Sequence, residues 1–211
     1  MARCTSLLAS LVLLLPATLH GQTAELPEGW QIRADRPGQD LSQVSFVDMP
    51  PGWHVTTGPA VILWNPATRA SGDFRVEMEV FLFDPEGRRE AFGVFVGGAD
   101  LAGDGQRYTY FLVRDGGEFI LKQREGSEAP TLVPWTAHEA IRGFAQRAEG
   151  DSSVRNVLAV EADGDEVRFS VNGREVASLP REGLALDGVV GLRVNHRLNL
   201  HVSRLEVTSS N

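Results

Sequence analysis

Residues 154–173, VRNVLAVEADGDEVRFSVNG, decide the fold class of this chain. Two runs with strand character, 154–162 and 166–171, are separated by Asp163-Gly164-Asp165. The second run ends at Asn172-Gly173, a pair that tolerates the positive φ of a two-residue hairpin turn. Connections this short cannot hold a crossover helix, so we expect antiparallel strands.

The same rhythm extends outward along the chain. In 73–83 the apolar side chains from Phe74 to Val80 alternate with Arg75, Glu77 and Glu79, which is typical of a strand with one solvated side. Further runs with strand character are 60–64, 91–96, 107–114, 118–124, 175–179, 189–194 and 198–207, and Asp115-Gly116-Gly117 joins two of them.

About ten strands with close turns favour an all-β, two-sheet antiparallel sandwich, a jelly roll, over a small barrel. The pattern allows at most one short helix, near 136–142, where Thr136 and Glu139 form a capping-box pattern. Pro27, Gly29 and Pro37 predict that 25–43 is an irregular lead-in, so the jelly-roll domain is expected over 44–211.

Residues 1–24 are predicted to be a cleaved export signal, with Arg3 before an apolar run at 7–15 and Pro16 after it. This run is shorter than the ~20 residues that cross a bilayer, so no membrane insertion is expected. Cys4 would leave with the signal. A mature chain without cysteine excludes disulfides, thiolate metal sites and a cysteine nucleophile. Such a product fits a bacterial periplasm or exterior.

The formal net charge of −8 makes nucleic acid and anionic membrane surfaces poor partners, because both are bound through clustered positive charge. The sequence also lacks a Gly-x-Ser-x-Gly elbow, a phosphate-cradling loop and a dinucleotide fingerprint. Serine hydrolase and nucleotide chemistry are therefore not expected.

The residues from 154 to 207 resemble the C-terminal half of concanavalin A-like and laminin-G-like jelly rolls. The resemblance rests on Asn156-Val-Leu-Ala-Val, on Val167-Arg-Phe-Ser-Val-Asn-Gly173 and on Gly188-Val-Val-Gly-Leu-Arg-Val194. Within that superfamily the chain is similar to bacterial secreted 3-keto-disaccharide hydrolase-like domains and to exported proteins with a Gly-Trp-His segment, here Gly52-Trp53-His54. The superfamily includes lectins, glycosidases and adhesion modules, so function has to be argued from sites.

The strand at 107–114 carries the main binding hypothesis. Phe111 and Val113 share one face, expected to be the core, while Tyr108 and Tyr110 share the other. The two phenols would line the open concave face, where jelly rolls commonly hold saccharides. The alternative is a tyrosine pair that merely covers a half-exposed sheet.

Three aromatic or imidazole side chains extend this hypothesis. Trp53 and Trp135 would stack on a sugar ring, and His54 would act as an acid, a base or a hydrogen-bonding group. Because Trp53 and His54 are adjacent, an extended backbone points them to opposite sides. The alternative for Trp53 is that it plugs the end of the sandwich.

Asn195 and His196 follow a strand and would supply hydrogen bonds to a saccharide. His201 follows five residues later, without His-x-x-x-His spacing, and His138-Glu139 lacks the second histidine of a metalloprotease helix. No metal site is expected from these histidines.

Glu77 and Glu79 are the nearest approach to the Glu-x-Asp-x-x-Glu strand of retaining glycosidases in this fold class, but the third acid is missing. With His54 they are the only catalytic candidates, and the alternative is a solvated strand face. Asp100 and Asp104 lie in a glycine-rich loop that could supply some oxygens to calcium; the alternative is a polar hairpin loop.

The sequence therefore favours a secreted module that binds carbohydrate on its concave face and needs no cofactor. Two alternatives stay open. One is a glycoside hydrolase of the 3-keto-disaccharide type, and the other is a non-catalytic envelope or adhesion protein with a protein partner.

Overall fold

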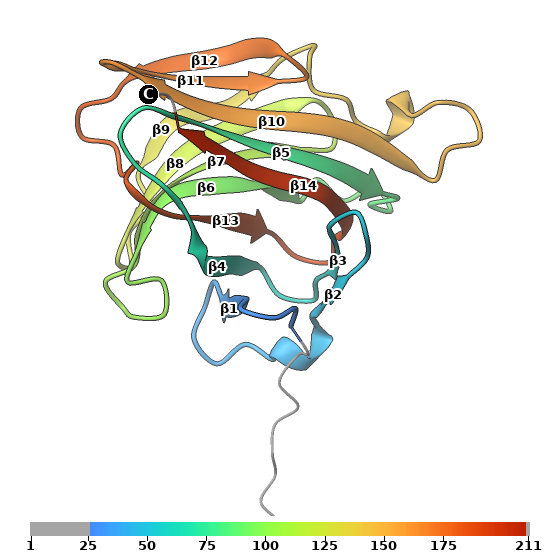
Figure 1. Ribbon diagram of the computed structural model, residues 1–211. Coiled ribbons are helices and arrows are strands. Elements are labelled where there is room, and N and C mark those ends of the chain that lie inside the picture. Colours follow the sequence, from blue (N-terminus) through green and yellow to red (C-terminus); the bar gives the residue numbers. More distant parts are fainter. Residues whose placement is uncertain (1–25, 210–211) are drawn as a thin grey trace, which may run out of the picture.

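The computed structural model describes residues 26–209 and places two seven-stranded antiparallel sheets face to face (Figure 1). In spatial order, sheet A holds β1 (Gln31–Ala34), β4 (Val61–Ala70), β13 (Gly188–Val194), β6 (Ala91–Ala99), β7 (Arg107–Arg114), β8 (Glu118–Glu125) and β9 (Thr131–Ala137). Sheet B holds β12 (Arg174–Pro180), β11 (Glu166–Val171), β10 (Ser153–Asp163), β5 (Phe74–Phe83), β14 (Asn199–Ser209), β3 (Trp53–Thr56) and β2 (Ser45–Asp48). The predicted all-β jelly-roll sandwich is confirmed.

Every run predicted to be a strand forms one, and the prediction missed β1, β2, β3 and β9. The missed strands are short or lie at or next to a sheet edge, where alternation is weakest. The predicted lead-in at 25–43 is thus only partly irregular: β1 extends sheet A by pairing Gln31 with Trp64 of β4, and Ile32 packs against the core.

Helical structure within residues 26–209 is limited to two 3-10 turns, η1 (Leu41–Gln43) and η2 (Phe144–Gln146). The second follows directly after the region where a short helix was allowed. The capping-box residues have other partners: the Thr136 hydroxyl donates to the Pro134 carbonyl, and Glu139 pairs with Arg174. No helix in this part of the chain is long and apolar enough to span a membrane.

The predicted hairpin at Asn172-Gly173 joins β11 to β12, with φ of 52° and 76°. Asn172 does more than turn the chain. Its Nδ2 donates to the Ala140 carbonyl at 2.7 Å and to Asn156 Oδ1 at 2.9 Å, and its Oδ1 accepts from the Val157 amide at 2.9 Å. The turn therefore ties the 140–142 segment to sheet B.

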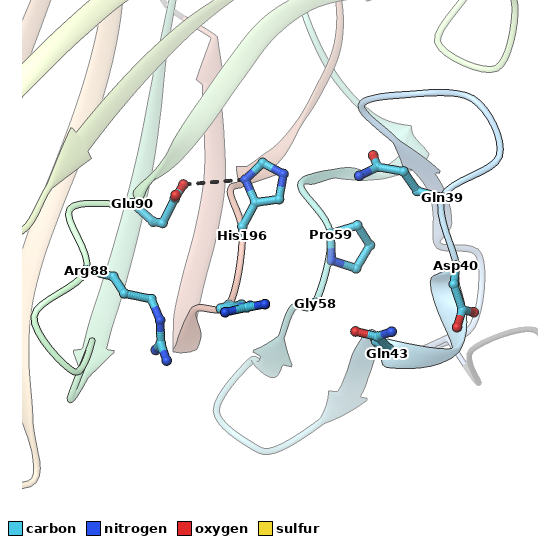
Figure 2. A pocket seen from close by; sticks show the side chains of 9 residues that line it. Gln39, Asp40, Gln43, Gly58, Pro59, Arg88, Glu90 and His196 are labelled. Atoms are coloured by element: carbon cyan, nitrogen blue, oxygen red, sulfur yellow. Dashed lines mark ion pairs between the residues drawn. The ribbon is translucent and has the colours of Figure 1, made fainter.

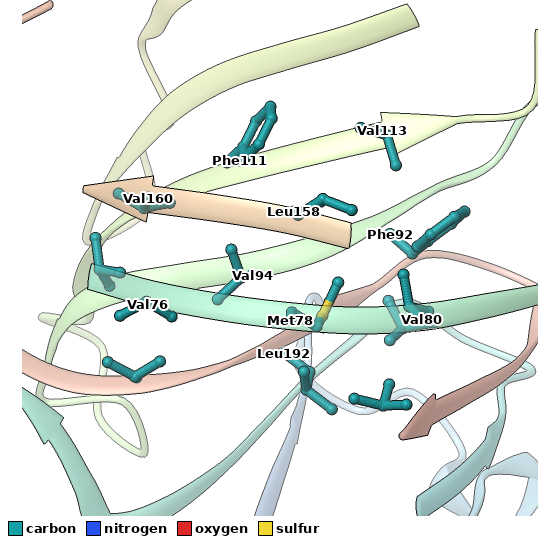
Figure 3. Packing of buried hydrophobic residues seen from close by; sticks show 14 of the residues in the cluster. Val76, Met78, Val80, Phe92, Val94, Phe111, Val113, Leu158, Val160 and Leu192 are labelled. Carbon is teal, nitrogen blue, oxygen red and sulfur yellow. The ribbon is translucent and has the colours of Figure 1, made fainter. Parts of the chain in front are cut away.

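The main core lies between the sheets (Figure 3). Alternate residues of β5, including Val76, Met78 and Val80, point into it. Phe111 of sheet A meets Phe169 of sheet B edge to face, with ring centroids 5.5 Å apart. Burying each such side chain contributes about 1.5–3 kcal/mol, so the two sheets stabilise each other.

A second apolar cluster covers the other side of sheet A, which we call the outer face of sheet A. The loop between β6 and β7 folds over this face, because its Leu101 is buried in the cluster. Arg33 of β1 holds the loop there by donating to the carbonyls of Leu101 and Gly103. The buried members are Ile62, Trp64, Ala91, Phe95, Leu101, Tyr108, Tyr110, Leu112, Ile120 and Val189.

Candidate functional site

The alternation predicted for β7 is confirmed: Phe111 and Val113 lie in the core between the sheets, and Tyr108 and Tyr110 lie on the outer face of sheet A. The expectation that the phenols are open is wrong. Tyr108 is 0% exposed and Tyr110 is 5% exposed, because the second apolar cluster encloses both rings. Burial also raises the pKa of both hydroxyls, so they remain neutral.

Arg193 of β13 occupies the space above the phenols. Its Nη1 donates to the Tyr108 hydroxyl at 3.0 Å, and its guanidinium lies 4.9 Å from the Tyr110 ring centroid. Gly191 makes room for the Phe95 ring, since a Cβ there would lie 2.5 Å from Phe95 Cζ. Tyr108 and Tyr110 thus hold the Arg193 guanidinium in position on the outer face of sheet A.

Arg193 also pairs with Asp35, just after β1, at 2.8 Å. Burial raises the pKa of Asp35, but the hydrogen bond and charge of Arg193 outweigh burial and hold that pKa below its usual value. Burial lowers the pKa of Arg193, and Tyr108 and Asp35 more than reverse this, so the net pKa is raised. Both groups stay charged, and the pair is a fixed dipole on the outer face.

Asn195 and His196 lie at the end of this face. The Asn195 amide donates to the Ala91 carbonyl at 2.9 Å, and the Asp35 amide donates to the Ala60 carbonyl at 2.8 Å, which continues the sheet by one row. The Asn195 Oδ1 is buried without a hydrogen-bond partner. Next along the chain, His196 is exposed, and its Nδ1 lies 3.6 Å from the Glu90 carboxylate.

A polar hollow of about 470 Å³, which we call the end pocket, opens beside His196 (Figure 2). It sits where β1 and β13 end and β4 and β6 begin, at one end of sheet A. Figure 2 shows His196, Glu90 and Arg88 facing Gln39, Gln43 and Asp40 across it. The lining residues are Gln39, Asp40, Gln43, Gly58, Pro59, Arg88, Glu90, His196 and Arg197.

Trp135 of β9 packs against the cluster on the outer face of sheet A and is half-buried. The Arg114 guanidinium lies 3.8 Å from its ring centroid and pairs with Glu118 at 2.7 Å. One side of the indole is therefore occupied by a cation. Tyr108, Tyr110, Trp135, Asn195 and His196 all belong to this face or its end, although the sequence separates them widely.

Trp53 and His54 lie elsewhere, on β3 of sheet B. Trp53 packs with Trp30 at 4.9 Å and Phe46 at 6.4 Å between ring centroids, as expected if it plugs the end of the sandwich. His54 points to the outer face of sheet B, 6.4 Å from the His201 ring. Burial lowers the pKa of His54, and His201 lowers it further. His54 lies in sheet B, whereas His196 follows β13 of sheet A.

Glu77 and Glu79 also point to the outer face of sheet B, within a surface of paired charges. Glu77 contacts Arg75 at 2.8 Å, and Glu79 contacts Arg155 and the Ser203 hydroxyl. The hydrogen bond from Arg155 holds the pKa of Glu79 below its usual value. The general acid of a glycosidase needs a raised pKa. The lowered pKa of Glu79 is the opposite of what that role requires.

The two loop carboxylates have protein partners. Asp100 Oδ2 accepts from the Gly105 amide at 3.0 Å, and Asp104 lies 3.5 Å from Arg33. Nδ1 of His138 accepts from the Ala140 amide at 3.2 Å. Among residues 26–209, no group of three or more His, Cys, Asp or Glu side chains is arranged to hold a metal ion.

Sequence reasoning missed Arg193, Asp35 and Glu90. For Arg193 a signal existed, since it is the one charged residue in the apolar run Gly188–Val194. Asp35 falls in the segment expected to be irregular, and Glu90 falls in a loop. Neither residue therefore belongs to a sequence pattern that would have indicated a binding role. Their roles arise only where the strand ends converge.

No family model matches the chain, and no curated protein matches it in sequence. Its fold is similar to that of carbohydrate-binding module CBM66 from Bacillus subtilis, at 15% identity and a TM-score of 0.60, covering 88% of this chain and 99% of that one. A Bacillus subtilis protein of unknown function with a galectin-like fold gives 12% identity, a TM-score of 0.58 and coverage of 85% and 89%.

A Bacteroides ovatus mixed-linkage glucan GH16 protein in complex with a G4G4G3G product gives 7% identity and a TM-score of 0.58, covering 85% of this chain and 94% of that one. At such low identities these likenesses show the fold alone. The chain has the concanavalin A-like jelly-roll fold, an architecture that it shares with carbohydrate-binding modules and glycosidases.

Proposed function

We propose that this protein is an exported saccharide-binding module that holds its ligand in the end pocket and on the adjoining outer face of sheet A. One observation carries the proposal: the end pocket combines cationic donors, carboxylate acceptors and side-chain amides around a single hollow of about 470 Å³. This volume lies within the range of small-ligand sites, ~300–1,000 Å³.

The chemistry of the lining suits a polyhydroxylated ligand. Each sugar hydroxyl both donates and accepts hydrogen bonds, and so do the amides of Gln39 and Gln43. Arg88 and Arg197 add donors, and Glu90 adds an acceptor. An apolar ligand would leave these groups without partners, which costs free energy. The similar fold of a carbohydrate-binding module supports the same class of ligand.

The predicted ligand residues take distinct roles in this proposal. His196 contacts the ligand directly from the pocket wall. Asn195, whose Oδ1 is buried, supports this end of the sheet through the hydrogen bond from its backbone amide to the Ala91 carbonyl. Tyr108 and Tyr110 act indirectly by positioning Arg193. Trp135, which is half-buried, contacts a sugar ring through the part of its indole that Arg114 does not cover.

A glycan array probed with residues 25–211 tests the proposal, followed by calorimetry of each hit. Gln43→Ala and His196→Ala should each weaken binding about tenfold, the effect of removing one or two good hydrogen bonds. Gln31→Ala, an exposed glutamine outside the pocket, is the matched control and should bind normally. An array without hits contradicts saccharide binding, while hits unaffected by both variants contradict the end pocket.

Glycoside cleavage is the second candidate, favoured by the contact between His196 Nδ1 and Glu90 at 3.6 Å inside the same pocket. An imidazole next to a carboxylate can act as a general base. Turnover of a 3-keto-glycoside that is lost in His196→Ala and in Glu90→Gln supports this candidate. Turnover that survives both substitutions, or that is absent over a broad panel, contradicts it.

Export rests on residues 1–24, which lie outside the described residues. Expression of the full chain in a bacterial host and mass spectrometry of the periplasmic fraction should find a mature N-terminus near residue 22 or 25. An uncleaved chain retained in the cytoplasm contradicts export.

A further inference from the structure

We propose that the ligand of the outer face of sheet A is an anionic saccharide, one that carries carboxylate or sulfate groups. This inference rests on the proposed saccharide-binding function and names its ligand class. Its starting point is the distribution of charge over the two outer faces of the sandwich.

Cationic side chains dominate the strand residues of the outer face of sheet A. Cross-strand partners point to the same side of a sheet, so the registers identify these residues. Arg193 pairs with Ile62, Lys122 with Tyr110 and Arg124 with Tyr108, and these partners all belong to the outer cluster. Among the strand residues, Glu118 stands alone as an acid against Arg33, Arg69, Arg114, Lys122, Arg124 and Arg193.

Arg69, Lys122 and Arg124 are the cations available to a ligand. Within residues 26–209 none of them forms an ion pair; Arg69 is exposed, and Lys122 and Arg124 are half-exposed.

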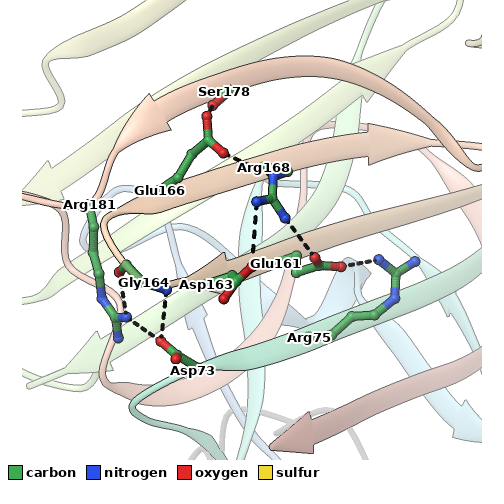
Figure 4. Close-up of polar contacts among 9 residues, drawn as sticks. All are labelled: Asp73, Arg75, Glu161, Asp163, Gly164, Glu166, Arg168, Ser178 and Arg181. Atoms are coloured by element: carbon green, nitrogen blue, oxygen red, sulfur yellow. Dashed lines mark hydrogen bonds and ion pairs between the residues drawn. The ribbon is translucent and has the colours of Figure 1, made fainter. Parts of the chain in front are cut away.

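The outer face of sheet B shows the opposite arrangement. Arg75 and Arg168 share Glu161, and Arg168 also contacts Asp163 and Glu166 (Figure 4). Arg155 and Arg204 likewise contact Glu79 and Glu77. Every arginine of that surface is therefore neutralised by the protein itself. Among the described strand residues of the two outer faces, the cations without an ion pair, Arg69, Lys122 and Arg124, therefore all lie on sheet A.

The spacing of these cations fits a chain of sugar units rather than one unit. Lys122 and Arg124 are two residues apart on β8, which separates them by about 6.8 Å. The end row of the sheet is formed by Glu118, Arg114 and Ala91. Lys122 lies four residues, or about 14 Å, from this row along β8, and β6 is two strands, or about 10 Å, from β8 across the sheet. A ligand whose terminal unit fills the end pocket would place later units over Lys122 and Arg124.

Guanidinium and ammonium groups recognise the anionic substituent of such units. The arginine fork matches a carboxylate with two parallel hydrogen bonds, and the lysine ammonium acts as a point charge. Because the groups are partly exposed, the attraction is screened over a Debye length of about 8 Å at physiological salt. Binding should therefore weaken as salt is added.

Affinity electrophoresis of the mature chain in gels containing matched polymers tests the inference. The pairs are polygalacturonate with its methyl ester, and dextran sulfate with dextran, and a polyglutamate gel serves as a third arm. We expect retardation by at least one anionic polymer, about tenfold stronger than by its neutral partner. The double variant Lys122→Gln/Arg124→Gln should abolish the difference. The control Arg107→Gln/Arg142→Gln removes the same charge from residues outside this face and should leave it intact.

The outcomes separate this inference from the proposed function. Equal retardation by charged and neutral polymers, or a preference that survives the double variant, overturns the anionic ligand and leaves saccharide binding in place. Retardation by polyglutamate as strong as by the anionic polysaccharides would assign the face to an acidic protein partner. That result also overturns the inference of an anionic saccharide. Absence of binding to every polymer and to the glycan array overturns both proposals. Preference for the uronate or the sulfate polymer identifies the group recognised.

Discussion

At the scale of the residue, Arg193 organises the outer face of sheet A. It is 7% exposed, contacts both tyrosines and neutralises Asp35. An arginine in an apolar strand destabilises the fold unless its buried charge is paired. The contacts of Arg193 with Asp35 and the two tyrosines are therefore expected to contribute to stability.

Arg193→Met should lower the free energy of unfolding by about 3 kcal/mol, because Asp35 would keep a partly buried charge without a partner. Urea denaturation measures the change. The double variant Arg193→Met/Asp35→Asn should recover part of the loss, since no uncompensated charge remains. Equal stability of the wild type and Arg193→Met would show that the pair contributes nothing.

The same pair predicts a pH dependence below pH 4. The pKa of Asp35 is depressed in the folded state, so its contribution is complete above its unfolded value of about 3.9 and is lost as pH falls through the folded pKa. Asp35→Asn should therefore flatten the acid limb of stability against pH. The acid limb of Asp48→Asn, an exposed control, should match that of the wild type.

His54 predicts a second pH effect, nearer to neutral. Its pKa is depressed by burial and by His201, so the unfolded chain takes up a proton before the folded chain does. Stability should be complete above about pH 6.5 and should fall as pH drops from there toward the folded pKa. His54→Gln should remove this part of the dependence in urea denaturation at pH 5 and 7. An unchanged difference between the two pH values would contradict the assignment.

Asn172 combines a backbone role and a side-chain role, and two substitutions separate them. Asn172→Gly keeps the positive φ but loses the side-chain hydrogen bonds, which should cost about 2 kcal/mol. Asn172→Ala loses both and should cost about 1 kcal/mol more. Thermal unfolding of the two variants provides the comparison, and a more stable alanine variant would contradict the turn argument.

At the scale of the element, β5 carries a ladder of charges on one side and core residues on the other. Glu77 and Glu79 sit in this ladder between the arginines of β10 and β14. Each carboxylate is engaged by arginines and has only 20–25% of its side chain exposed, so the two are better described as members of a surface of paired charges than as a catalytic pair.

Glu77→Gln and Glu79→Gln should each change stability by less than about 1 kcal/mol and should leave any saccharide binding unchanged. Calorimetry with a glycan hit and urea denaturation check both statements. A loss of binding or of turnover in either variant would return these glutamates to the candidate site. Val76→Ala, on the core side of the same strand, should cost about 2 kcal/mol and serves as the contrast.

At the scale of the whole molecule, one core joins both sheets, and this predicts cooperative unfolding. The buried cluster contains residues of β5, β10 and β11 together with residues of β6, β7 and β13. Neither sheet can keep its inner face covered alone, so we expect a single two-state transition.

The tryptophans allow this to be measured. Trp64 and Trp135 report on sheet A, whereas Trp53 reports on sheet B. Fluorescence and far-UV circular dichroism should give coincident urea transitions, in the wild type and in Trp53→Phe. Separate midpoints for the two probes would show that the sheets unfold independently.

The sequence by itself determined ten of the fourteen described strands, most hairpin turns and the side of several strands that faces the core, because a period of two and the φ of Asn172-Gly173 are local properties. It placed Tyr108 and Tyr110 on the correct face but could not show that they are covered. Leu101 of the loop before β7 covers that face, and Arg33, which is distant in the chain, holds the loop there.

Only the tertiary structure decided the site. The end pocket forms from loops that share no pattern and meet because β1, β4, β13 and β6 are neighbours in one sheet. The same strand order brings Arg69, Lys122 and Arg124, which have no ion pair among the described residues, onto one outer face, whereas the arginines of the other outer face are paired. Sheet order depends on long-range pairing and packing, and net charge and local periodicity contain no information about it.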